Sequence, residues 1–436
     1  MQIHRALRAV LGAGLIAYPG AVAGQQTTWL PAVRDACPRI WRDSTDRFDA
    51  LANCAFASFT DTPIHALMQS IAPLSGIGFG AVYHREQMAA RYQNQLYANV
   101  VATFGRSWSA TLRYRVSLPA VCDSDGCPVD RPLLQIGASY RDLHTLNFFG
   151  LGPNSSTDAF QFGLKEGRMG VSAAVPIRTW FVLLGSVDFL EPRVERGGTA
   201  SPVIGNFDEA SAPGVSRQTA FIKSGAGVNL RFGETDSLHI ALNYSHSADL
   251  HGAHYSFNQF SAAPKWDWVL HFACDPAVPE KAVPTSQQQM ASRPDPSCER
   301  GTLGVGGKLV ISSPESGAAV PFFYQPSLGG TDIDGFDTLR GFRDYRFRGA
   351  DALLFQAQYT RTLRLLFGFG VLAFADAGQV ATHVSGFRWS SFRFDYGPGV
   401  TFSLGRIEVA RLYLGLGGGE GTHVGFEFSR AASLSQ

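Results

Sequence analysis

Stretches of about ten residues in which apolar side chains alternate with polar or small ones recur along most of this chain. Leu112, Tyr114 and Val116 alternate with arginines and small residues, and the pattern returns at 134–141, 238–245 and 424–428. Alternation puts one kind of side chain on each face of a strand, and a tilted strand of about ten residues crosses a bilayer. The chain is therefore predicted to be all-β and to form a transmembrane antiparallel β-barrel.

A soluble antiparallel sandwich would also alternate apolar with polar residues. The strand-like stretches are longer than the usual five or six residues, and aromatic residues reach 12% of the chain, often near the ends of these stretches. Charged residues make up only 17%. Beyond the N-terminal region, no apolar run has the roughly eighteen residues that a membrane-spanning helix needs. These features favour the barrel.

The length of the alternating region predicts the number of strands. Some 350 residues lie between Gly76 and Phe428, and one crossing with its share of turn takes roughly 20 to 23 residues, which gives about sixteen strands. The short connection 362–364 is expected to be periplasmic. The segment between Cys274 and Cys298, rich in Pro and Gln, is expected to be a long extracellular loop.

The chain is expected to have four parts. Residues 1–23 have Arg5 and Arg8, then an apolar run, then Ala21-Val22-Ala23, which is typical of a cleaved signal peptide. Residues 24–75 are expected to form a short helical or irregular segment, which is a periplasmic cap, a plug in the lumen or merely a short ordered arm. The barrel is expected to occupy 76–428, and 429–436 to be a C-terminal tail. With export predicted, the bacterial outer membrane is the expected location.

The six cysteines fall into three pairs that are local in sequence, and each pair brackets a polar stretch. Export leads to an oxidising compartment, which favours disulfides between neighbours. The candidate pairs are Cys37 with Cys54, Cys122 with Cys127, and Cys274 with Cys298.

Composition and motifs argue against several other functions. The 37 basic and 36 acidic side chains leave a net charge of +1, so nothing suggests nucleic acid as a partner. The chain lacks the local motifs of hydrolases, zinc proteases and phosphate-binding loops. Histidines 246, 251, 254 and 271 are interpreted as solvated rather than metal-binding. We expect no enzyme activity, no cofactor and no metal.

Several motifs in the second half of the chain resemble those of the bacterial surface antigen family, which includes the outer-membrane assembly factors BamA and TamA. Leu339-Arg340-Gly341-Phe342 is similar to the Arg-Gly-Phe motif of the family's long loop, which folds back into the lumen. Phe374-Ala375-Asp376-Ala377-Gly378 resembles its Phe-x-Asp-x-Gly strand motif, and Gly397-Pro398-Gly399 the Gly-x-Gly of the next strand. Earlier in the chain, Phe148-Phe149-Gly150-Leu151-Gly152 is similar to another stretch of these barrels.

Strand parity assigns roles to these residues. Asp376 has the parity of Phe374, opposite to the lipid-facing positions, so its carboxylate should point into the lumen. Arg340 offers this carboxylate a bidentate pair that would hold the loop inside, as the resemblance implies. Gly341 would allow the backbone to turn or approach closely, and Phe342 would pack against lumen aromatics such as Phe374. The alternative is an exposed Arg340 that contacts lipopolysaccharide.

This sequence departs from the family in three ways. Gln358 stands where the family usually has Glu, so the site should carry less charge. The fifty or so residues before the barrel are too few for a periplasmic polypeptide-transport-associated domain. Phe428 is followed by eight further residues rather than ending the chain.

The resemblance implies a barrel that translocates a polypeptide or lipid, or inserts it into the membrane. The alternative is a passive porin, in which lumen charges set only selectivity. Expected partners are outer-membrane lipid and lipopolysaccharide, a polypeptide or lipid client, and a separate periplasmic protein.

Overall fold

The computed structural model describes residues 63–88, 92–118, 131–198, 201–233, 237–274, 298–363, 369–404 and 407–428. The predicted signal peptide, most of the N-terminal segment 24–75, the C-terminal tail and Cys37, Cys54, Cys122 and Cys127 lie outside the described residues.

Sixteen antiparallel strands form one sheet in which each strand pairs with its neighbours in the chain, so the predicted fold class and strand number are confirmed. Two further short strands, β12 (Ser327–Leu328) and β13 (Phe347–Arg348), pair with each other. The strands of the main sheet are β1 (Ile64–Ser70), β2 (Ile77–Met88), β3 (Gln93–Thr103), β4 (Trp108–Ser117), β5 (Leu133–Phe148), β6 (Phe160–Arg178), β7 (Phe181–Arg196), β8 (Phe221–Phe232), β9 (Ser237–Asp249), β10 (Phe257–Cys274), β11 (Cys298–Pro314), β14 (Asp351–Thr362), β15 (Phe369–Ala381), β16 (Arg393–Leu404), β17 (Ile407–Gly417) and β18 (Thr422–Phe428).

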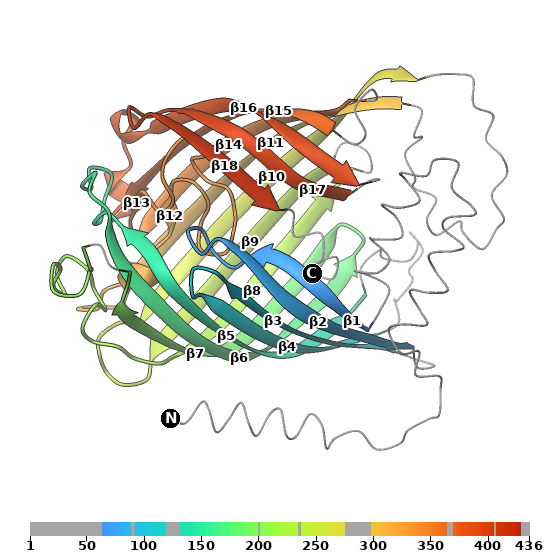
Figure 1. Cartoon of the computed structure of the whole chain (residues 1–436). Helices are drawn as coiled ribbons and strands as arrows, with labels where there is room; N and C mark the ends of the chain where they lie inside the picture. The colour runs from blue at the N-terminus through green and yellow to red at the C-terminus, as the bar shows by residue number, and fades with distance from the viewer. Residues whose placement is uncertain are drawn as a thin grey trace.

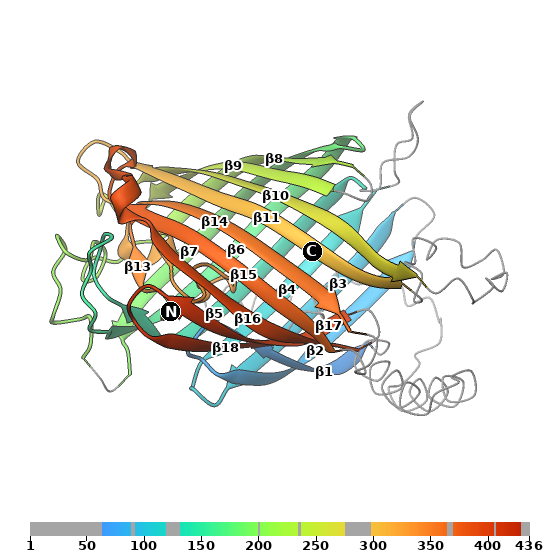
Figure 2. The same cartoon turned by 90° about the horizontal axis from the view of Figure 1, so that it is seen from above.

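The sheet curls into a barrel (Figures 1 and 2). Strands β1 and β18 approach one another, but no ladder joins them in the described part of the chain. This junction between the first and last strands is called the seam below. Among the described residues, no helix has the length and apolar character needed to cross a membrane.

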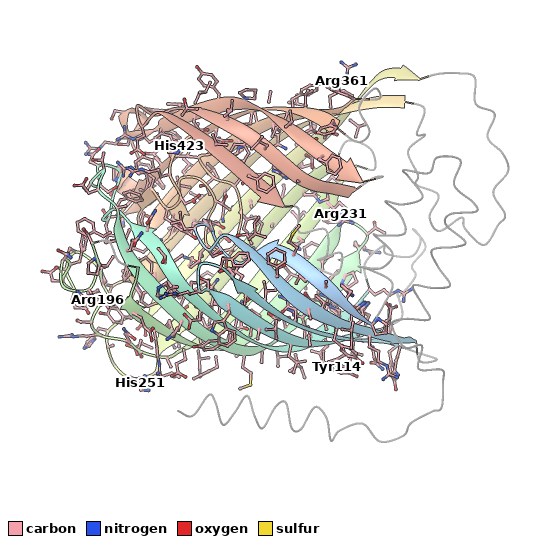
Figure 3. The ribbon with its side chains drawn as sticks, in the orientation of Figure 1. Tyr114, Arg196, Arg231, His251, Arg361 and His423 are labelled. Carbon is pink, nitrogen blue, oxygen red and sulfur yellow. The ribbon has the colours of Figure 1, made fainter. Side chains whose placement is uncertain are left out.

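The outer face of the barrel is apolar, as alternation predicted. In β15 every odd-numbered position from Phe369 to Ala375 is exposed and every even-numbered position is buried. Tyr114 is 42% exposed and points away from the barrel wall (Figure 3), and Ile136 and Phe426 are exposed in the same way. In a bilayer these side chains contact lipid.

The barrel has two ends, and one prediction about them is wrong. Arg196 and His251 lie at one end, called the loop end, whereas Arg231 and Arg361 lie at the opposite end (Figure 3). Alternate connections of an antiparallel meander lie at the same end. The connections β10 to β11 and β14 to β15 are therefore both at the opposite end. The segment after Cys274 was predicted from composition alone to lie across the membrane from 362–364, and composition does not record strand parity.

The sheet also starts earlier than Gly76, because β1 pairs with β2 from Ile64 onward. Strand β1 has only seven residues, and Leu67 is buried on the face opposite to Ile64 and Met68, which are exposed. Apolar residues on both faces of a short strand hide the alternation that identifies the longer strands.

The segment 315–350 between β11 and β14 folds back into the barrel and is called the lumen loop (Figure 1). It contains the 3₁₀ turn η2 (Phe322–Tyr324). The ring of Phe322 lies 5.0 Å from that of Phe148 and 4.9 Å from that of Phe162, all fully buried. The main core of the molecule is thus inside the barrel, between its wall and this loop. Two more 3₁₀ turns, η3 (Val384–Gly386) and η4 (Trp389–Ser391), lie between β15 and β16.

Candidate functional site

Arg340 and Asp376 are in direct contact inside the barrel. Nε and Nη2 of Arg340 each donate to one oxygen of the Asp376 carboxylate at 2.8 Å, and the Arg340 backbone N–H donates at 3.3 Å. Arg340 is 2% and Asp376 3% exposed. The pair is bidentate and excluded from solvent, the geometry in which a charge-assisted hydrogen bond is strongest. It fixes the tip of the lumen loop to β15.

A third Arg340 nitrogen and the planar face of the guanidinium are also occupied. Nη1 donates to Oε1 of Gln358 at 2.6 Å, so the amide predicted to replace the family's carboxylate does bind the arginine. The guanidinium carbon lies 3.9 Å from the centroid of the Phe374 ring, a cation–π contact. Gln356 donates to the Thr338 carbonyl at 3.0 Å and to Asp376 at 3.3 Å.

The loop tip lies so close to the wall that glycines are required on both sides. A Cβ on Gly341 would lie 2.6 Å from the Cβ of Asp395, and one on Gly415 of β17 would lie 2.6 Å from the Gly341 Cα. These spacings are shorter than any van der Waals contact, so a methyl group at either position forces the backbones apart.

Phe342 packs against an aromatic ring in the lumen, as predicted, but the ring is that of Phe347 rather than Phe374. The two rings lie 5.2 Å apart, within a buried cluster that includes Leu339 and Leu354. Phe374 contacts Arg340 and Tyr413 instead. The turn at Gly341 sends residues 340 and 342 in different directions, which the motif alone does not reveal.

The strand-motif glycines make room on the inner face. A Cβ on Gly378 would lie 3.0 Å from a methyl group of Leu328, and one on Gly397 would lie 3.0 Å from the Phe374 ring. A Cβ on Gly399 would meet the Leu412 carbonyl oxygen at 2.7 Å. Gly378 admits the lumen loop, and Gly397 admits the ring on which Arg340 stacks.

A second set of contacts, missed by the sequence reasoning, ties the lumen loop to the rim. Arg346 donates to Glu420 in the turn between β17 and β18, and Arg343 lies 3.5 Å from the same carboxylate. Both guanidinium groups also lie over the Phe149 ring, at 4.7 Å for Arg343 and 5.1 Å for Arg346. Gly152 pairs with Arg348 through an isolated bridge. The stretch from Phe148 to Gly152 is therefore a docking edge for the lumen loop.

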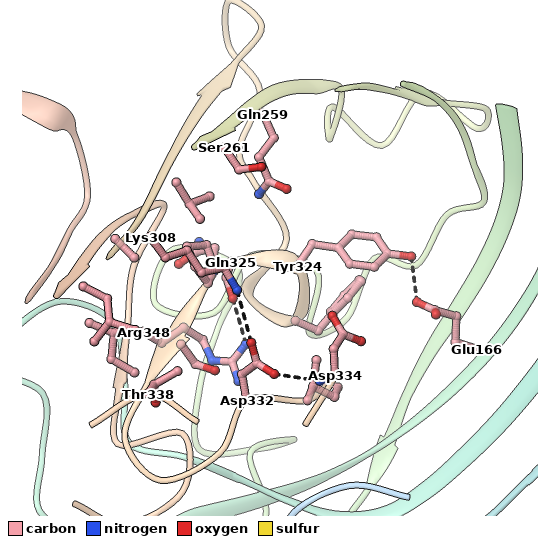
Figure 4. Close-up of a pocket in the computed structure, with 18 of the residues that line it drawn as sticks. Glu166, Gln259, Ser261, Lys308, Tyr324, Gln325, Asp332, Asp334, Thr338 and Arg348 are labelled. Atoms are coloured by element: carbon pink, nitrogen blue, oxygen red, sulfur yellow. Dashed lines mark hydrogen bonds and ion pairs between the residues drawn. The ribbon is translucent and has the colours of Figure 1, made fainter. Parts of the chain in front are cut away.

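A polar cavity of about 290 Å³ lies between the lumen loop and residues of β5–β8, β10, β11 and β14 (Figure 4). Lys308 pairs with Asp332 at 3.3 Å, and Tyr324 donates to Glu166 at 3.1 Å. Buried Arg348 donates to the carbonyls of Phe322 and Gln325, and burial lowers its pKa to about 10.

A second cavity, of about 570 Å³, lies at the seam. It is lined by the turn between β1 and β2, by the lumen loop at Thr331 and Asp344, and by residues of β17 and β18 such as Tyr413 and Phe426. Burial raises the pKa of Asp344 to about 6. The lumen loop therefore borders the place where the described residues of the first and last strands form no ladder.

No family model and no curated protein matches the sequence. Among solved structures, BamA from Haemophilus ducreyi lacking POTRA domains 1–3 aligns with a TM-score of 0.50 and 11% identity, over 90% of this chain and 80% of that one. The fold of this chain is similar to that of BamA.

Two further structures align less well. CdiB from Escherichia coli aligns with a TM-score of 0.49 at 12% identity, over 84% of this chain and 62% of CdiB. OccK10 (OpdN) from Pseudomonas aeruginosa aligns with a TM-score of 0.31 at 8% identity, over 84% of this chain and 92% of that one.

Proposed function

We propose that this protein is a bacterial outer-membrane barrel that translocates a polypeptide or lipid, or inserts it into the membrane, and that its lumen loop controls passage. The observation that carries the proposal is the seating of the loop tip by Arg340 and Asp376. A passive channel gains nothing from a buried ion pair that holds an obstruction in its lumen, because such a pair costs several kcal/mol of desolvation per ion. A gate does need one defined closed position.

The seam supports the same proposal. Without a ladder between β1 and β18 in the described residues, the barrel can open sideways at a lower cost than breaking a paired edge. The cavity at the seam is lined by both edge regions and by the lumen loop. A client that enters there contacts the gate directly. In this proposal the loop end faces the cell exterior, and lipid and lipopolysaccharide surround the apolar wall.

The second candidate is a porin, favoured by the charged lining of the 290 Å³ cavity. Planar-bilayer conductance of the refolded barrel separates the two. We expect small, fluctuating openings in the parent and larger ones in Arg340→Ala. The control is Arg388→Ala, which removes an exposed arginine at the loop end. Large steady pores, identical in all three proteins, would contradict a gating role of the lumen loop and support the porin.

A further inference from the structure

Asp395 is a second buried carboxyl group next to the Arg340–Asp376 pair. Arg340 of the lumen loop pairs with Asp376, and no second cation of the loop pairs with Asp395 among the described residues. It lies on β16 directly across from Asp376, and the two residues are Cα partners in the β15–β16 ladder. Asp395 is 2% and Asp376 3% exposed. Both share parity with lumen-facing positions of their strands, since Phe374 and Gly397 are buried beside them. Two carboxyl groups therefore meet out of reach of bulk water.

Hydrogen bonding is distributed unequally between the two groups. Asp376 accepts from Arg340 Nε and Nη2, from the Arg340 backbone N–H and from Gln356. Neither oxygen of Asp395 accepts a hydrogen bond of good geometry among the described residues when both carboxyl groups are counted as acceptors, and the one donor near it is the Gly341 backbone N–H. A buried carboxylate with so little donation is strongly disfavoured, whereas a neutral carboxyl group brings a donor of its own.

The charged groups on the surrounding elements do not supply Asp395 with the pairing that Asp376 has. Asp376 on β15 and Arg340 on the lumen loop act most strongly on Asp395. On β17, the Cα partner of Asp395 is Gly417, which has no side chain, while Arg411 pairs with Asp337 of the lumen loop at 3.1 Å. The remaining titratable and charged neighbours are turned to other partners, namely Arg393 to the Pro153 carbonyl and the Phe347 ring, and Tyr413 to the Phe374 ring.

We propose that Asp376 and Asp395 hold one proton between them, with the hydroxyl of Asp395 donating to the Asp376 carboxylate, and that this proton keeps the tip of the lumen loop seated. One guanidinium then balances one negative charge. Two adjacent carboxylates in a dry site cannot both stay ionised beside a single cation, so one of them retains its proton.

The packing of Gly341 links the proton to the loop. The Gly341 backbone lies directly on Asp395, and Gly415 closes the other side. Water therefore cannot hydrate a second carboxylate unless the Arg340-Gly341 turn lifts. When pH rises and the proton leaves for solvent, the new negative charge repels Asp376 and favours the lifted turn. Low pH should hold the gate closed, and high pH should release it.

Infrared spectroscopy of the folded barrel tests the shared proton without any client. We expect a carboxylic-acid C=O stretching band at neutral pH that shifts on transfer to deuterated water and disappears in Asp395→Asn. The control Asp188→Asn removes a buried carboxylate that Arg168 already binds at 2.8 Å, and it should leave the band unchanged. Absence of the band in the parent would overturn the proposal, even if the variants fail to fold.

Conductance against pH tests the consequence for the loop. We expect openings of the parent to grow in size and frequency as pH rises, and those of Asp395→Asn to stay small at every pH, because an amide donates to Asp376 and cannot ionise. Identical pH profiles would refute the link between proton and loop. A missing infrared band would contradict the shared proton but not the proposed gating role of the lumen loop. Porin-like pores in the parent would contradict the gating role but not the shared proton.

Discussion

Arg346 of the lumen loop donates to the carboxylate of Glu420 in the turn between β17 and β18. Arg343 lies beside the same carboxylate at 3.5 Å. Strand β18 continues from this turn and borders the seam, so one acidic side chain connects the lumen loop to the last strand of the barrel. Movement of the loop and opening of the seam should therefore be coupled.

Weakening the contacts of Arg343 and Arg346 with Glu420 should make the β17–β18 hairpin open more often. In Glu420→Gln both arginines lose their carboxylate, and hydrogen bonds to charged groups contribute about 1.5–3 kcal/mol. We expect amide hydrogen exchange in 417–422 to become roughly tenfold faster or more. Glu191→Gln, which breaks an ion pair within β7, is the matched control. Unchanged exchange in 417–422 would contradict the coupling.

Arg340→Ala should lower the stability of the folded barrel markedly, because it leaves the Asp376 carboxylate buried and unpaired. Breaking one partner of a buried ion pair costs about 3–5 kcal/mol. Arg340→Lys retains the charge but loses the bidentate geometry, so its loss should be intermediate. Urea titration followed by the mobility shift between folded and unfolded barrel measures both. Equal midpoints for parent and Ala variant would show that the pair contributes nothing.

Gln358→Glu should be destabilising by itself, because it places a third carboxyl group around one guanidinium. Combined with Asp395→Asn it should be tolerated, since the number of acidic groups at Arg340 returns to two. A double-mutant cycle in urea should then give a favourable coupling of about 1 kcal/mol or more. Additive effects would mean that Gln358 and Asp395 do not share the arginine.

The pH dependence of the loop between β7 and β8 should follow Glu209. Burial disfavours its charge, but hydrogen bonds from Ser216, Tyr255 and Gly214 outweigh burial and lower its pKa to about 2. A lowered pKa stabilises the folded loop above the ordinary value of 4.5, and this contribution disappears as pH falls from there towards 2. We expect acid-protease cleavage in 201–220 to appear only across that window. Glu209→Gln should be cleaved at neutral pH by a neutral protease that leaves the parent intact, and a resistant variant would contradict the prediction.

Cys274 and Cys298 should form a disulfide across the ends of β10 and β11. The two residues are Cα partners in the ladder, although their side chains lie outside what the structure describes. Thiol labelling of unfolded protein should fail at both positions until a reductant is added. Labelling without reductant would exclude the bond.

Local patterns predicted much of this molecule, and non-local register determined the rest. Alternation fixed the two faces of β15, and the motif order placed Arg340 near Asp376. The sequence motifs did not identify Asp395, because its role depends on Asp376 being its partner in the β15–β16 ladder. Strand register sets this pairing, and neighbouring residues in the sequence do not reveal it. Glu420 was missed for the same reason, since it stands 74 residues from Arg346.

Strand β1 has seven residues and is bounded on both sides by described residues that are not in the strand, whereas β6 has nineteen. At roughly 3.3 Å per residue and a tilt near 45°, seven residues reach only about 16 Å across an apolar layer of about 25 Å. Lipid tails beside β1 must shorten and disorder to match it, at a fraction of a kcal/mol for each ångström of mismatch. The membrane next to β1 would thus be thinner than the membrane next to β6.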